Sequence, residues 1–89
     1  MDFQEHPQLV YWEDGACLHL DVRPMLEAGG EPYAHIMDVV GKLETTQTLI
    51  VHALFEPKPL IRVLERMGKN VSATRVTAEH WELAVTNAE

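Results

Sequence analysis

Two segments of this chain, residues 32–41 and 59–68, share one pattern. Each begins with proline, places apolar residues at positions i, i+3, i+4 and i+7, and ends with glycine. A proline fits the first turn of a helix, where a missing N–H costs nothing, and a glycine often follows the last turn. An apolar, β-branched run precedes each segment, at residues 18–22 and 49–54. The sequence therefore predicts strand, loop, helix twice over, each helix starting within about two residues of its proline.

Strand signals also occur on both sides of this repeat. The Asp14-Gly15 pair lies between the β-rich residues 9–12 and 16–22, and Asp-Gly in that setting favours a hairpin. Residues 71–77 and 81–86 indicate a second antiparallel pair of strands. The expected order of elements is therefore hairpin, α, β, α, β, β.

This order predicts a two-layer α/β (α+β) sandwich. Right-handed crossovers would place both helices on one face of a mixed four-stranded sheet, with an extra N-terminal strand or hairpin. We expect one domain, residues 1–89, in which residues 1–8 form a loosely ordered tail. Residues 23–30 are expected to form a loop and residues 78–80 a turn.

Charge and length exclude several functions. The chain has 89 residues, a net charge of −7, and only seven Lys and Arg residues, which are scattered. Nucleic acids and anionic membranes are therefore poor partners. No apolar run approaches the roughly 18 residues of a membrane span, and the N-terminal residues do not resemble a secretory signal, so we expect a cytoplasmic protein. The single cysteine, Cys17, predicts no internal disulfide and no Cys-rich zinc site.

Three motifs together resemble a known bacterial family. They are His19-Leu20-Asp21-Val22-Arg23-Pro24, then Glu31-Pro32 at a helix start, then Phe55-Glu56-Pro57-Lys58-Pro59-Leu60. Over residues 12–85 the chain resembles the family named domain of unknown function 2249. This resemblance implies a relation to the TusA/SirA sulfur-carrier fold, and a setting beside hemerythrin-like domains in respiratory or redox systems.

A sulfur-relay function is one alternative that follows from this resemblance. The first helix of the TusA/SirA carriers opens with Cys-Pro-x-Pro, and Gly29 stands where that cysteine would be. Glycine has no thiol, and Cys17 falls in a predicted strand, where we expect a half-buried apolar side chain. The sequence therefore predicts no stable persulfide.

Five histidines make a metal or heme site a second alternative, because imidazole is a common metal ligand. Their spacing matches no metal-binding signature. However, His19, Asp21 and His52 would be neighbours on the outward face of the sheet if their two strands pair in parallel. They are weak candidates, since three convergent ligands do not follow from the sequence, and we expect no cofactor.

Candidate binding residues cluster where predicted strands end. In open α/β sheets, ligands bind at the carboxyl ends of the strands. The candidates there are Arg23, Gly29, Gly30, Glu31, His52, Phe55 and Glu56. The chain shows no recognisable catalytic set, so we expect a non-enzymatic binding or accessory domain. Its partner would be a protein or a small ligand, and a second copy is expected on the open, partly apolar face of the sheet.

Overall fold

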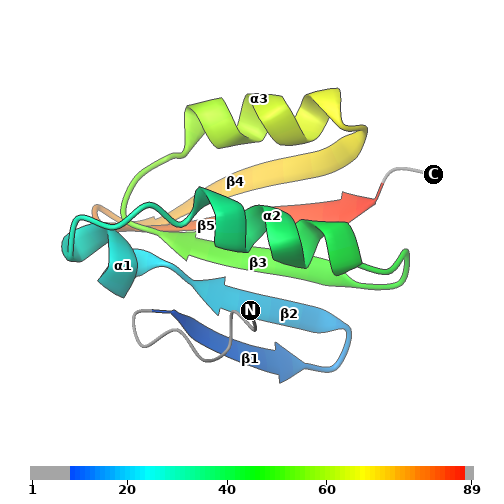
Figure 1. Ribbon diagram of the computed structural model, residues 1–89, viewed down its shortest axis with the longest axis horizontal. Coiled ribbons are helices and arrows are strands. Elements are labelled where there is room, and N and C mark those ends of the chain that lie inside the picture. The colour runs from blue at the N-terminus through cyan, green and yellow to red at the C-terminus, as the bar shows by residue number, and fades with distance from the viewer. Residues whose placement is uncertain (1–8, 88–89) are drawn as a thin grey trace.

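The computed structural model describes residues 9–87 and contains one five-stranded sheet and three helices. The elements, in chain order, are β1 (Val10–Asp14), β2 (Cys17–Asp21), α1 (Arg23–Glu27), α2 (Tyr33–Lys42), β3 (Thr48–Ala53), α3 (Lys58–Arg66), β4 (Lys69–Thr77) and β5 (His80–Asn87). The sheet order is β1-β2-β3-β5-β4 (Figure 1). The tail expected at residues 1–8 lies outside the described residues.

The sheet is mixed. Strands β2 and β3 run parallel, whereas β1 pairs with β2, and β5 pairs with both β3 and β4, in antiparallel fashion. The sequence predicts a four-stranded sheet with an extra N-terminal strand. In the structure this extra strand, β1, pairs with the edge of β2, so all five strands form a single sheet. The fold is thus α+β, as predicted.

Both predicted helix starts are confirmed. Helix α2 begins at Tyr33, directly after Pro32, and α3 begins at Lys58, one residue before Pro59. The sequence pattern predicts that each helix ends at its glycine. This holds for α3, because Gly68, with a φ of 85°, follows the end of that helix. It does not hold for α2, because Gly41 lies inside that helix.

The loop predicted for residues 23–30 is wrong in its first half. Residues Arg23–Glu27 form α1, a helix of five residues with Pro24 in its first turn. Met25 is buried against the core, which stabilises the turn. The chain then reverses at Gly29, whose φ of 82° suits glycine.

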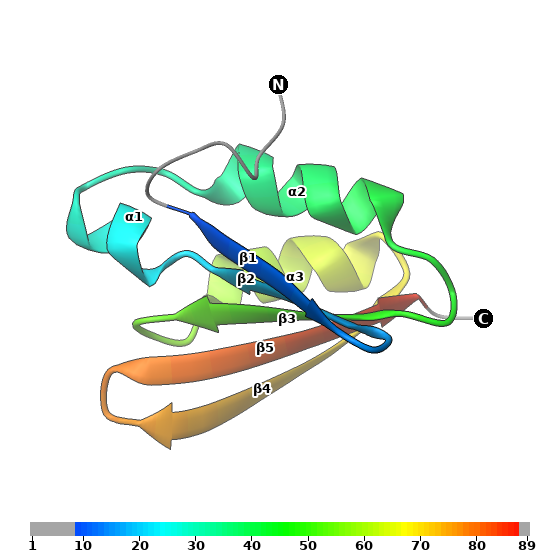
Figure 2. The same cartoon turned by 90° about the horizontal axis from the view of Figure 1, so that it is seen from below.

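The core lies between the sheet and the helices. Figure 2 shows the helices on one side of the sheet, and no helix of residues 9–87 covers the other side, which we call the open face. Alternate residues of β2, β3 and β5 face the helices, among them the fully buried Leu20, Leu49 and Leu83. Because strand side chains alternate, the residues between them face the open side.

Two predicted turns differ from the observed turns by one residue. Asp14 pairs with Cys17, so the first hairpin turns at Gly15 and Ala16. His80, expected in the second turn, pairs with Thr77 as the first residue of β5. The second turn is thus one residue shorter than predicted, and His80 lies on the open face as part of β5.

Candidate functional site

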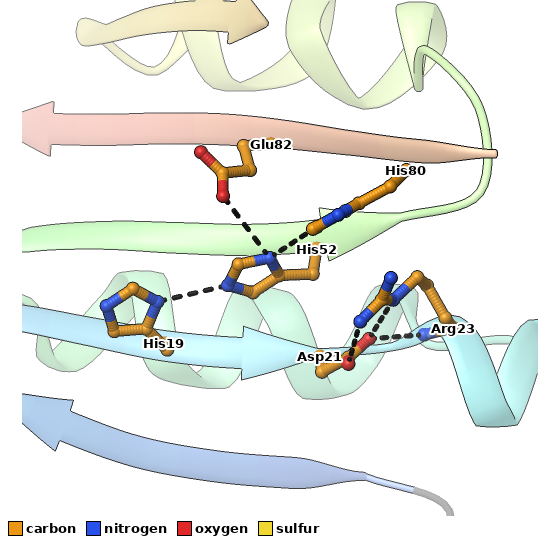
Figure 3. A network of polar contacts seen from close by, with 6 residues as sticks. All are labelled: His19, Asp21, Arg23, His52, His80 and Glu82. Carbon is orange, nitrogen blue, oxygen red and sulfur yellow. Dashed lines mark hydrogen bonds and ion pairs between the residues drawn. The ribbon is translucent and has the colours of Figure 1, made fainter. Parts of the chain in front are cut away.

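Three histidines and a glutamate meet on the open face of the sheet. His19 comes from β2, His52 from β3, and His80 and Glu82 from β5 (Figure 3). The strand registers bring them together. His52 lies opposite Asp21 on β2 and opposite Glu82 on β5. His19 and His80 each lie two residues before those partners and so face the same side of the sheet. We call these four residues the histidine cluster.

His52 is the centre of the histidine cluster. Its Nε2 lies 3.0 Å from Nδ1 of His19, and its Nδ1 lies 2.9 Å from Nε2 of His80. The Glu82 carboxylate lies on the same side as His80, with Oε2 3.8 Å from Nδ1 of His52. Both ring nitrogens of His52 therefore have an imidazole within hydrogen-bonding distance (Figure 3).

Trp12 of β1 covers the cluster from one side. Its ring stacks on His19, with centroids 4.6 Å apart and planes within 5°. It also stacks on His52 at 5.3 Å and 21°. His52 is consequently only 5% exposed, although it faces away from the helices.

Burial keeps the His52 imidazole neutral. Desolvation lowers the pKa of His52, and His19 and His80 act in the same direction. The carboxylates of Asp21 and Glu82 oppose this shift but do not cancel it. A neutral imidazole has a free nitrogen lone pair, which is the form that binds a metal ion.

Three atoms of the cluster converge closely enough to share one ion. One ligand atom each from His52, His80 and Glu82 lies within 4.8 Å of the others. Two imidazole nitrogens that bind one tetrahedral ion at about 2.1 Å are about 3.4 Å apart. His52 Nδ1 and His80 Nε2 lie 2.9 Å apart, at hydrogen-bonding distance, so the two rings must separate by about 0.5 Å to bind one ion together.

An acidic recess adjoins the cluster at His80. It has a volume of about 380 Å³ and is lined by Asp21, Arg23, Pro24, Glu27, Leu54, Thr77, Glu79 and His80. Three carboxylates and one guanidinium give the recess an acidic character. A cation that approaches His80 through it therefore meets a favourable potential.

Arg23, a predicted binding residue, is bound to Asp21 in the wall of this recess. Its Nε and Nη2 donate to the two carboxylate oxygens of Asp21 at 2.9 and 2.8 Å, and its backbone N–H donates to Oδ1 at 3.0 Å. Burial alone would raise the pKa of Asp21, but the hydrogen bonds and charge of Arg23 outweigh it, and the pKa is lowered. The Arg23 side chain therefore braces the end of β2.

The other predicted residues lie elsewhere at the carboxyl ends of the strands. Glu31 and Phe55 line an apolar crevice of about 460 Å³ between the starts of α2 and α3. Gly29 and Gly30 form the turn after α1, where a Cβ on Gly30 would lie 2.7 Å from Cγ of Met25. Glu56 lies in the β3–α3 corner, with Oε1 3.9 Å from Nζ of Lys58. The predicted set is thus distributed over separate places, and only His52 belongs to the histidine cluster.

Sequence reasoning found part of this cluster and missed the rest. Parallel pairing of β2 and β3 brings His19 beside His52, as the sequence predicted, while Asp21 is bound to Arg23 instead. His80 was missed because the predicted turn included it, and Glu82 was missed because the pairing of β3 with β5 was not predicted. Their signal is the alternation in β5, where His80 and Glu82 flank Trp81 and precede Leu83.

Comparison with known proteins gives a family without an activity. A family described as an uncharacterized conserved protein, DUF2249, matches residues 19–87. The matched segment begins at His19 and includes all four residues of the cluster. No curated protein and no solved structure matches the chain.

Proposed function

Since this chain belongs to the DUF2249 family, whose description names no activity, we propose from its geometry that it is a small metal-binding domain. In this proposal it binds one transition-metal ion on the open face of the sheet and acts by binding, not by catalysis. The observation that carries the proposal is the convergence of His52, His80 and Glu82 within 4.8 Å.

The donor set selects a class of ion. Imidazole suits zinc, copper, iron and nickel, whereas magnesium and calcium prefer sites made of oxygen atoms alone. Two imidazoles and one carboxylate therefore favour a first-row transition metal over magnesium or calcium. Water would complete the coordination on the open side.

Two features support uptake of such an ion. The neutral His52 imidazole needs no deprotonation, and the Glu82 side chain, 39% exposed, has room to move toward the ion. The acidic recess and the net charge of −7 both attract cations.

We also propose that β2, β3, β5 and β4, with α2 and α3, correspond to the TusA/SirA-like unit that the resemblance implies. The order of elements supports this relation. A sulfur relay has less support, because Gly29 has a φ of 82°, which a cysteine adopts rarely. Cys17 begins β2, at the end of that strand remote from the start of α2 (Figure 1).

Zinc titration of the whole chain tests the proposed metal site. We expect isothermal titration calorimetry and native mass spectrometry to give one zinc ion per chain. Glu82→Gln and His80→Asn each remove a ligand and should weaken binding by more than about 100-fold, beyond the loss typical of an outer partner. The mass spectrum also reports whether the chain forms the dimer expected from its sequence.

Matched substitutions remote from the cluster serve as controls. His35→Asn changes a histidine of α2, on the other side of the sheet, and Glu65→Gln changes an exposed glutamate of α3. Both should bind zinc like the original chain. Zinc binding that is absent, or that is equally strong in the Glu82 and His80 variants, would contradict the metal site.

A further inference from the structure

His19 is not one of the three converging ligands, yet it contacts the central one. His19 Nδ1 lies 3.0 Å from His52 Nε2, on the side of the ring opposite His80 and Glu82. The two rings are nearly coplanar, with planes 16° apart and centroids separated by 5.3 Å. This side-by-side arrangement is the one that an in-plane N–H···N hydrogen bond requires.

The direction of this hydrogen bond follows from the metal site. If Nδ1 of His52 binds the ion, the proton of the neutral ring is on Nε2. That N–H is buried and needs an acceptor, and Nδ1 of His19 is within reach. Metal-binding histidines usually donate their second N–H in this way, which fixes both the tautomer and the orientation of the ring.

Trp12 holds the acceptor in place. Its ring lies parallel to His19 at 4.6 Å and extends over His52, so it restricts rotation of both imidazoles out of their shared plane. His19 therefore presents Nδ1 to His52 before any ion arrives. Such preorganisation increases affinity because less side-chain freedom is lost on binding.

We infer that His19 is a positioning residue for the metal site, accepting the Nε2–H of His52 so that His52 offers Nδ1 to the ion. The inference rests on the proposed function. It assigns to His19 a role in metal affinity without direct contact with the metal.

Two substitutions at His19 test separately the two properties of its side chain, the hydrogen-bond acceptor and the aromatic ring. Asn places its carbonyl oxygen near the position of Nδ1 and keeps the acceptor, whereas Phe keeps a ring under Trp12 and loses the acceptor. We expect His19→Phe to weaken zinc binding by about 10- to 100-fold and His19→Asn to change it by less than about threefold. His19→Ala, measured in parallel, also removes the acceptor but adds no bulk, and it should weaken zinc binding like His19→Phe.

A spectroscopic signature distinguishes this role from general packing. In the zinc-loaded protein, nitrogen-15 NMR should show His52 protonated at Nε2, with slow exchange of that proton in the original chain and in His19→Asn. Exchange should be fast in His19→Phe. His35→Phe is the matched control and should alter neither affinity nor exchange.

The outcomes separate this inference from the proposed function. Tight zinc binding by both His19→Phe and His19→Ala would overturn the positioning role and leave the metal site intact. Equal weakening in His19→Asn and His19→Phe would also overturn it, since the acceptor would then not matter. A chain that binds no zinc overturns the proposed function and this inference with it.

Discussion

At the scale of single residues, Asp21 shows how one ion pair holds a strand end beside the histidine cluster. Its carboxylate accepts three hydrogen bonds from Arg23 alone. The Asp21 side chain is 13% exposed and that of Arg23 is 33% exposed, so solvent screens the pair only in part. The pair therefore contributes more to stability than a typical surface salt bridge.

We predict that Arg23→Ala lowers the stability of the fold. Loss of two charged side-chain hydrogen bonds to a largely buried carboxylate should cost about 1 to 3 kcal/mol. In a domain of this size, that decreases the Tm by about 5 °C or more. Thermal unfolding followed by circular dichroism measures the change. Arg23→Lys keeps the charge but loses the paired geometry, and its Tm should be intermediate.

The same pair predicts a dependence on pH. The pKa of Asp21 is lowered from 3.8, so the contribution of the pair is fully present above that value and is lost as the pH falls through the lowered pKa. The difference in Tm between the original chain and Arg23→Ala should therefore shrink in acid. A difference independent of pH, or an unchanged Tm at neutral pH, would contradict the bracing role.

At the scale of elements, two glycines with the same place in the sequence pattern have opposite roles. Gly41 lies inside α2 and Gly68 follows α3 with a φ of 85°. A Cβ at either position would meet no atom within 4 Å, so backbone conformation alone decides the effect of a substitution.

We predict that Gly41→Ala stabilises the protein by about 0.5 to 1 kcal/mol, because alanine favours a helix interior. Gly68→Ala should destabilise it by about 1 kcal/mol, because alanine is strained at positive φ. Urea unfolding of both variants measures these changes. Changes of the same sign would show that the two helix ends are equivalent, contrary to the structure.

The elements also show what the sequence could predict. The helix starts and the β5 strand depend on local signals such as Pro32, Pro59 and alternating apolar residues, and these were predictable. Helix α1 was not, because its stability depends on burial of Met25 by the rest of the fold. The histidine cluster was predicted only as far as His19 and His52. His80 and Glu82 join it through the pairing of β3 with β5, and the chain contains no local signal for which strands pair.

At the scale of the whole molecule, the proposed ion would join two parts of the sheet. His52 lies on β3, while His80 and Glu82 lie on β5, which pairs with the edge strand β4. No helix of residues 9–87 is long and apolar enough to cross a membrane.

We predict that zinc stabilises the whole fold. An ion that binds only the folded chain contributes about 2.7 kcal/mol at 100 times its Kd. The Tm should then increase by about 10 °C or more. Magnesium at the same concentration should have little effect, and Glu82→Gln should abolish most of the increase. An equal response to zinc in Glu82→Gln would place the ion elsewhere.

The register of strand β3 decides whether the histidine cluster can form. Leu49 and Val51 of β3 belong to the core, and His52, between Val51 and Ala53, faces the opposite side. A shift of one residue in its pairing would exchange the two faces, burying the imidazole among the helices and separating it from His80 and Glu82. An ion that binds only when β3 pairs in the observed register would stabilise correctly folded chains and not chains in which this strand is misaligned. Metal binding would therefore select the fold that forms the site.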